Sequence, residues 1–142
     1  MRTELLMTLL AGFAGGLSGT LWGGLISTPL LARTRSNWPT EVRAESASRL
    51  LLGAALYGAC GVAAGFLFWL GWALVALVDI TWPMVGLLYG TLLWAAAALP
   101  ALMTLALRLD KLRRLALVQM LEALVTCASI GVLCAFVWHR TA

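Results

Sequence analysis

Apolar residues fill four long stretches of this 142-residue chain, and charged residues gather between them. The stretches cover about residues 5–32, 50–78, 83–107 and 115–138. A helix needs roughly 20 apolar residues to cross the hydrocarbon core of a bilayer, and each stretch reaches that length. Backbone polar groups in lipid have to be bonded within their own segment, and no period-two alternation favours a barrel. The pattern predicts an all-α integral membrane protein, a four-helix bundle forming one transmembrane domain over residues 1–142.

Composition agrees with a lipid environment. Hydrophobic residues make up 62% of the chain and charged residues 11%, whereas a globular protein is roughly half apolar. The formal net charge of +4 is interpreted as a mark of cytoplasmic loops, and no nucleic-acid partner is expected. Cys60, Cys127 and Cys134 lie inside apolar stretches without C-x-x-C spacing. They are interpreted as small buried hydrophobic residues rather than metal ligands or disulfides.

The distribution of Lys and Arg predicts the orientation of the four spans. The first and third connections carry eight basic residues, namely Arg33, Arg35, Arg43, Arg49, Arg108, Lys111, Arg113 and Arg114. The opposite side carries only Arg2 and Arg140. Because basic residues favour the cytoplasmic side, loop 33–49 should be cytoplasmic and both termini extracytoplasmic. Four tryptophans near the extracytoplasmic span ends fit an interfacial belt: Trp69, Trp72, Trp82 and Trp138.

Loop 33–49 is the longest connection and contains a helix-start signal. Asn37 can cap, Pro39 suits a first turn, and Glu41 favours the positive helix end. The residues after it form either a short interfacial helix or an extension of the second span. Six basic residues on this side are candidates for contacts with anionic lipid headgroups: Arg33, Arg35, Arg43, Arg49, Arg113 and Arg114.

The first and third spans resemble each other when the sequence is shifted by 71 positions. Seven identities fall within 17 positions, pairing Gly15, Leu17, Gly19, Thr20, Leu21, Pro29 and Leu31 with Gly86, Leu88, Gly90, Thr91, Leu92, Pro100 and Leu102. The second and fourth spans barely match. Two readings stay open, chance similarity between Leu- and Gly-rich segments or a duplication of two helical hairpins (2+2). A duplicated hairpin would give parallel halves related by an axis along the membrane normal.

Glycines at helical spacing predict close helix packing. The expected packing positions are Gly12, Gly16, Gly19, Gly23, Gly61, Gly65, Gly86 and Gly90. They serve either packing within the chain or, on the first span, docking of a second copy or another subunit. Pro29 and Pro100 should kink the first and third spans at matching places.

Glu122 is the leading candidate for chemistry because a carboxyl inside a span is unfavourable and usually faces the protein interior. Gln119, Glu122, Thr126 and Ser129 recur at three- and four-residue intervals and predict one polar stripe on the last span. The stripe is either a proton or cation relay or a set of hydrogen bonds across helices. Asp79 is interpreted as a turn residue at the extracytoplasmic boundary.

Several aromatic residues lie too deep to be interface anchors. Trp22 and Trp94 need partners for their indole N–H groups and should line the interior, where Tyr57 and Tyr89 could join them. Core packing is the simpler interpretation, and ligand stacking is the alternative.

No enzyme is expected, and no cofactor or metal site. Gly16-Leu17-Ser18-Gly19 resembles the G-x-S-G motif of rhomboid proteases, but the single histidine, His139, stands at the end of the last span. One histidine also excludes bis-histidine haem, and the chain has no C-x-x-C-H, phosphate-loop or H-E-x-x-H motif.

The Gly-rich first span ending in Pro, the Arg/Pro-bearing loop and the Trp-Pro-x-x-Gly-x-x-Tyr-Gly start of the third span resemble YagU-type bacterial inner-membrane proteins. The resemblance covers the first three spans. It implies a small multi-pass protein of the bacterial inner membrane without an established biochemical activity. The histidines of that family in the second and third spans are lacking here, so no functional residue is carried over.

Two functions are compatible with these features. The first is a non-catalytic component of the lipid bilayer, either an accessory subunit bound to other membrane proteins or a scaffold built from copies of itself. The alternative is a small proton- or ion-coupled transporter or channel that uses Glu122 and the kinked spans.

Overall fold

The computed structural model describes residues 2–27, 29–30, 47–75, 80–108 and 113–141. Within these residues the chain is all-helical, apart from the two residues before Trp82. Four of the described helices are long and apolar enough to cross a membrane: Thr3–Ile26, Leu51–Gly71, Trp82–Thr104 and Arg113–Thr141. The hydrophobic pattern therefore predicted the helical class and the four apolar spans correctly.

The elements follow in chain order as α1 (Arg2–Trp22), η1 (Gly23–Ser27), α4 (Ala47–Val75), α5 (Trp82–Leu93), η2 (Trp94–Ala98), α6 (Leu99–Arg108) and α7 (Arg113–Thr141). α4 begins at residue 47 rather than 50, and α7 covers 113–141 rather than 115–138. Helical hydrogen bonding continues past the apolar stretch, so hydropathy places the ends less well than the centres. Residues 28, 31–32 and 76–78 of the predicted spans, and Asp79, lie outside the described residues.

The third span begins with a local signal that the sequence contains. Thr81 is extended (φ −65°, ψ 141°), and its carbonyl accepts hydrogen bonds from Met84 N–H at 3.0 Å and Val85 N–H at 3.1 Å. Pro83 occupies the first turn, where a missing N–H removes no helical hydrogen bond. The start of α5 is therefore fixed by its own residues.

The first and third spans both contain a π-helical segment, and the two segments start 71 positions apart, at Gly23 and Trp94. In η2 the Leu99 N–H donates to the Trp94 carbonyl, five residues earlier. Pro29 and Pro100 each follow two residues after a segment. A proline ring collides with the carbonyl four residues before it in a regular α-helix, and a wider turn relieves that collision. A π-helical turn thus precedes each proline, and the kinks predicted at Pro29 and Pro100 stay a prediction.

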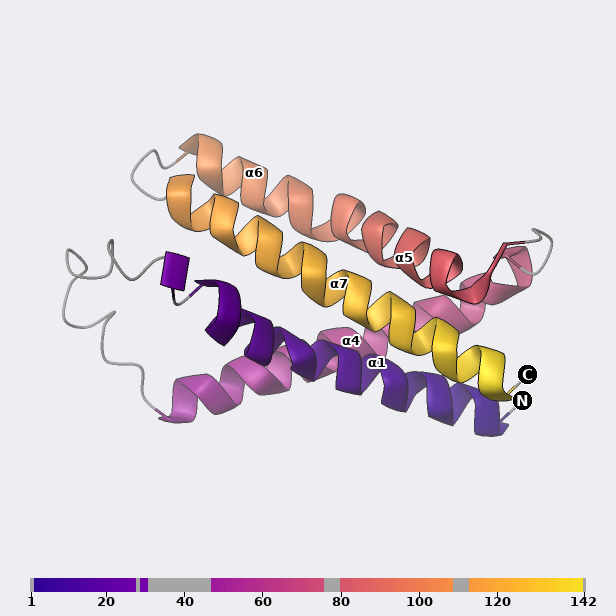
Figure 1. Ribbon diagram of the computed structural model, residues 1–142. Helices are drawn as coiled ribbons and strands as arrows, with labels where there is room; N and C mark the ends of the chain where they lie inside the picture. Colours follow the sequence, from indigo (N-terminus) through magenta and orange to yellow (C-terminus); the bar gives the residue numbers. More distant parts are fainter. Residues whose placement is uncertain (1, 28, 31–46, 76–79, 109–112, 142) are drawn as a thin grey trace.

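Figure 1 shows α7 lying between α1 on one side and the α5–η2–α6 helix on the other. α4 crosses behind α1 and packs against it. The start of α1 and the end of α7 lie at the same end of the molecule. This arrangement puts α7 in contact with the other three spans.

The glycines of α1 form two rows that face different helices. Gly12 and Gly16 lie against α4, where a Cβ added at Gly12 would be 3.0 Å from the Gly65 Cα. Gly15 lies against α7, where an added Cβ would be 2.7 Å from the Ile130 Cα. Glycine therefore lets the backbone of α1 approach two neighbours at once. These glycines thus lie against neighbouring helices of the same chain.

The α5 glycines repeat the second of these rows. A Cβ added at Gly86 would lie 2.7 Å from the Val132 Cα, and one added at Gly90 would lie 2.7 Å from the Ala128 Cα, both on α7. Gly86 and Gly90 are the counterparts of Gly15 and Gly19 under the 71-residue shift. The two similar helices, α1 and α5, consequently pack against the same partner through equivalent positions.

α4 and α5 also touch, through one aromatic contact. The Tyr89 hydroxyl donates to the Ala64 carbonyl of α4. The Phe68 ring meets the Tyr89 ring edge-on, with centroids 5.0 Å apart and an interplanar angle of 86°. Tyr89 therefore lies inside the helix assembly, as expected, rather than at its surface.

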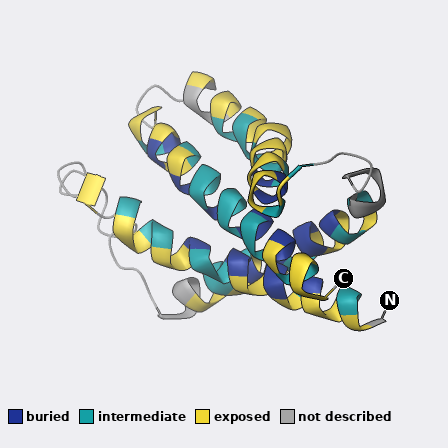
Figure 2. Ribbon diagram, turned by 45° about the vertical axis from the view of Figure 1, so that its right-hand side comes forward, coloured by how far each residue is buried: buried dark blue, intermediate teal, exposed yellow. Residues whose placement is uncertain are grey.

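An aromatic and basic cluster lies at the end of the molecule that holds the termini. Trp82 stacks on His139, with ring centroids 6.0 Å apart and an interplanar angle of 15°, and it meets Phe136 at 5.5 Å. The Arg140 guanidinium carbon is 5.5 Å from the Phe136 ring centroid. Such amphipathic residues suit a membrane–water interface. Figure 2 shows the buried residues where α1, α4, α5 and α7 come together, and the described residues of η2 and α6 include none.

Candidate functional site

Glu122 is a buried carboxyl in α7, with 8% of its surface exposed. It lies nine residues after Arg113, or about 14 Å along the helix axis. Buried residues recur at every fourth position around it, in the row Val118, Glu122, Thr126, Ile130 and Cys134. This row is the face of α7 that the α1 glycines approach. The carboxyl is thus enclosed between helices and is not directed to the lipid.

Tyr57 of α4 reaches across to this carboxyl. Its hydroxyl donates a hydrogen bond of 2.8 Å to Glu122 Oε1. The two residues are 65 positions apart in the sequence, and no pattern in either helix pairs them. The sequence predicts an interior position for Tyr57 but does not identify its partner.

Glycines on α1 and η1 provide the room that the pair occupies. A Cβ added at Gly23 would lie 2.9 Å from Glu122 Oε1, and one added at Gly19 would lie 2.7 Å from Tyr57 Cδ1. Gly23 is the first residue of the π-helical segment η1. The carboxyl therefore lies directly beside the point where the first span leaves α-helical geometry.

Hydroxyl groups next to Glu122 are engaged with the backbone of α7. Thr126 Oγ1 donates to the Glu122 carbonyl at 2.9 Å, and Ser129 Oγ donates to the Val125 carbonyl at 2.8 Å. The Trp22 indole Nε1–H donates to Ser129 Oγ at 3.1 Å, which connects α1 to α7. The Thr126 and Ser129 hydroxyls are thus hydrogen-bonded within α7, and Ser129 also connects α7 to α1.

Gln119 departs from the predicted stripe because it is exposed. The buried row on α7 has a spacing of four, so the position before Glu122 in that row is Val118. Gln119 lies three residues and Val118 four residues before Glu122, and either spacing places a residue on the same face of a helix. The sequence could therefore not show which of the two is buried. The structure brings Glu122, Thr126 and Ser129 together and leaves Gln119 outside.

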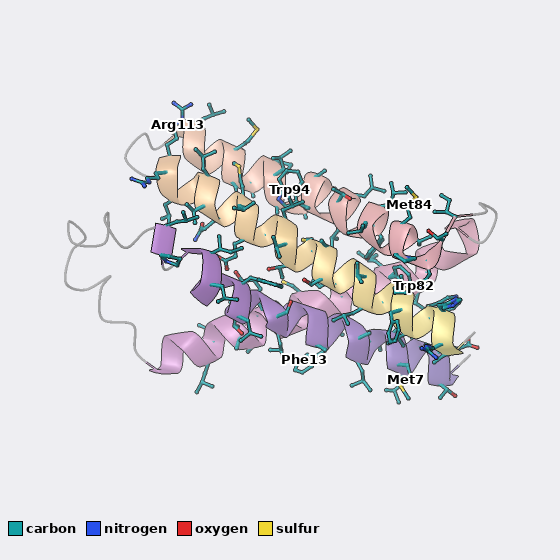
Figure 3. The ribbon with its side chains drawn as sticks, viewed as in Figure 1. Met7, Phe13, Trp82, Met84, Trp94 and Arg113 are labelled. Atoms are coloured by element: carbon teal, nitrogen blue, oxygen red, sulfur yellow. The ribbon has the colours of Figure 1, made fainter. Side chains whose placement is uncertain are left out.

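The second deep tryptophan contacts α7 from the opposite side. The Trp94 Nε1–H donates to the Met120 carbonyl at 3.0 Å, and Figure 3 shows its ring between η2 and α7. Gly23 and Trp94 occupy equivalent positions under the 71-residue shift and meet α7 at neighbouring levels, Glu122 and Met120. The first residues of the two π-helical segments therefore contact α7 only two residues apart.

The basic candidates are only partly within the described residues. Arg113 and Arg114 are exposed at the start of α7, and Figure 3 shows Arg113 at the end of the molecule away from the termini. Arg33, Arg35 and Arg43 lie outside the described residues, as does the side chain of Arg49. The predicted lipid-headgroup contacts therefore stay a prediction.

Within the described ranges, no group of three or more His, Cys, Asp or Glu side chains could hold a metal ion. The cysteines are free, with Cys60 exposed, Cys127 half-buried and Cys134 buried. The Cys134 thiol lies 3.8 Å from the Thr8 carbonyl of α1. Cys134 is thus a packing residue, as predicted, whereas Cys60 lies on the outer face of α4.

Comparisons with known protein families, with curated proteins and with solved structures found no match.

Proposed function

We propose that this chain is a non-catalytic, multi-pass component of a membrane, acting as an accessory subunit of a larger complex or as a scaffold of several copies. The observation that supports this function is the way in which interior polar side chains link the helices. Tyr57 joins α4 to α7, Trp22 joins α1 to α7, and Tyr89 joins α5 to α4. Each bond uses a polar group that would be unfavourable in lipid. These hydrogen bonds connect α1, α4, α5 and α7 to one another.

The outer surface of this unit is apolar. Large hydrophobic side chains are exposed along every described span, for example Leu21, Leu51, Met84, Leu107 and Leu117. Figure 3 shows Met7 and Phe13 on one outer edge and Met84 on the other. In a membrane such a surface contacts lipid chains or other transmembrane helices. A unit whose polar groups are satisfied inside is suited to support other membrane proteins.

The proposal includes the bacterial inner membrane and a topology with both termini extracytoplasmic. The basic residues on the first and third connections and the resemblance to YagU-type proteins support it. The 2+2 arrangement of repeated hairpins belongs to the same proposal. The equivalent packing of α1 and α5 on α7 supports duplication of the first helix of each half.

The test is purification of the tagged chain from its own membrane in a mild detergent, followed by light scattering and mass spectrometry. We expect either a stoichiometric membrane partner or a stable homo-oligomer. A monodisperse monomer without a partner, obtained in the mildest detergents that extract it, would contradict the proposal.

A second candidate function is a small proton- or ion-coupled transporter or channel. The observation that favours it is Glu122, a carboxyl buried within a span, nine residues from its start and beside the η1 turn. Intramembrane carboxyls are typical of ion pathways, and π-helical turns are common at functional sites. Purified protein in liposomes with a pH-sensitive dye inside should then show ion flux that Glu122→Gln abolishes. Equal flux in empty liposomes would exclude this function.

A further inference from the structure

We propose that the aromatic and basic cluster at the end of α7 binds the phosphate group of an anionic membrane phospholipid. The cluster consists of Trp82, the first residue of α5, and of Phe136, His139 and Arg140 on α7. The proposal rests on the chain lying in a membrane, which the four apolar spans support, and on neither candidate function. It holds in whichever leaflet this end of the molecule lies.

The four side chains of the cluster form a continuous row across two helices. His139 stacks on Trp82 at 6.0 Å, and Trp82 meets Phe136 at 5.5 Å, each measured between ring centroids. Beyond Phe136, the Arg140 guanidinium carbon is 5.5 Å from the ring centroid. Figure 3 shows Trp82 beside the last turns of α7. The imidazole and the guanidinium are therefore each held against one ring of the same aromatic pair.

Both of these groups can donate hydrogen bonds to an anion. His139 and Arg140 are exposed, and a cation–π contact uses the charge of a guanidinium rather than a hydrogen-bond acceptor. The planar guanidinium carries five N–H donors, in a geometry that matches two oxygens of one phosphate. The imidazole has at least one N–H donor in either protonation state. The cluster thus combines a positive charge with directed donors.

The position of the cluster along the spans indicates a lipid headgroup as the source of the phosphate. The apolar stretch of α7 ends at Trp138, so His139 and Arg140 follow it directly. Trp82 stands at the start of α5, another apolar span. Residues at the ends of apolar spans lie at the level of the lipid headgroups, where tryptophan is enriched. The donors are therefore at the depth where phospholipids carry their phosphate.

The charge of the cluster favours an anionic lipid over one with an ammonium headgroup. None of its four residues is acidic. Within the described ranges the acidic residues are Glu122 in α7 and Glu4 in the first turn of α1, and neither belongs to the row. An ammonium group would find no carboxylate among the four side chains, whereas the headgroup of phosphatidylglycerol needs none.

The test is native mass spectrometry of the full chain in detergent, with phosphatidylglycerol and phosphatidylethanolamine of the same acyl chains titrated separately. We expect phosphatidylglycerol to bind more tightly. Arg140→Gln should weaken its binding about fivefold, the loss expected for one basic residue at an anionic lipid. Arg140→Lys keeps the charge without the planar fork and should lie between the two. Phe136→Leu should also weaken binding, because the ring that holds the guanidinium is gone.

Arg2→Gln is the matched control, because it removes the same charge from the start of α1, at the same end of the molecule. It should change the binding of phosphatidylglycerol less than twofold, and far-UV circular dichroism should show that every variant keeps its helices.

Three outcomes would overturn the proposal. Equal affinity for the two lipids would mean that the cluster does not select an anionic headgroup. Equal weakening by Arg2→Gln and Arg140→Gln would mean that net charge alone attracts the lipid. Displacement of the bound lipid by inorganic phosphate would mean that the site takes a free anion from water.

Discussion

The Tyr57 hydroxyl donates a 2.8 Å hydrogen bond to Glu122 Oε1, joining α4 to α7 inside the membrane-spanning part of the protein. α4 packs mainly on α1, so this bond reaches past the α1 glycines to the next helix. The buried carboxyl of α7 therefore accepts a hydrogen bond from a residue of α4. The stability of the helix assembly should depend on this contact.

Replacing Tyr57 by Phe should lower the free energy of unfolding by about 1 kcal/mol, since hydrogen bonds between membrane helices are worth about that much or less. The measurement is SDS-induced unfolding in mixed micelles, followed by far-UV circular dichroism. Tyr57→Phe combined with Glu122→Ala provides the control, because alanine removes the acceptor oxygen. If the two groups interact directly, the double variant should lose less than the sum of the single variants. Strict additivity would contradict the contact.

A methyl group at Gly23 should disturb the Glu122 carboxyl, because the new Cβ would lie 2.9 Å from Oε1. Gly24, the next residue of η1, is a matched control, since a Cβ there would meet nothing within 4 Å. We expect Gly23→Ala to be less stable than Gly24→Ala by about 1 kcal/mol, at the lower end of overpacking effects. The same unfolding assay measures it.

The difference between the two alanine variants should disappear when Glu122 is also changed to Ala, because the atom that the new methyl group meets is then removed. A difference that persists in that background would show that Gly23 is needed for another reason, such as the backbone of η1.

The crossing of α1 and α4 should not tolerate a side chain at Gly61. A Cβ there would collide with the Gly12 carbonyl and lie 2.9 Å from the Gly16 Cα, and both contacts are backbone. Gly61→Ala should therefore cost about 1–3 kcal/mol. Gly53→Ala on the same helix meets nothing within 4 Å and should be neutral or stabilise by up to about 1 kcal/mol. Equal stability of the two variants in thermal melting would contradict the crossing.

The orientation predicted from the basic residues can be tested with reporters. A reporter that is active only outside the cytoplasm should work when fused after Ala142, and it should be inactive when inserted in loop 33–49. The expected physical cause is the bias of eight basic residues against two. A cytoplasmic signal from the C-terminal fusion would reverse the assignment.

The repeated sequence and the helix contacts illustrate what pattern analysis could and could not predict. The 71-residue shift aligned Gly15 with Gly86, but it could not tell that both positions would face α7. Glycine spacing indicates that one face of a helix carries only small residues. It does not identify which neighbouring helix packs against that face. The division of the α1 glycines between α4 and α7 therefore became visible only in the structure.

The candidate site was predicted in part for the same reason. Burial of Glu122 follows from one residue and its place in an apolar stretch. Its contact with Tyr57, and the exposure of Gln119, depend on which row of α7 meets α1. The sequence shows which residues share one face of a helix. It does not show which residues of another helix contact that face.

The sequence by itself determined that the chain is helical and has four apolar spans, because backbone hydrogen bonding and transfer to lipid depend on local composition. It also placed a proline at matching positions of two spans, and the structure shows a π-helical turn before each. Only the tertiary structure decided that α7 lies between two similar helices and that Tyr57 holds Glu122. Those contacts join residues far apart in the chain, and they depend on the complementary shapes of whole helix faces.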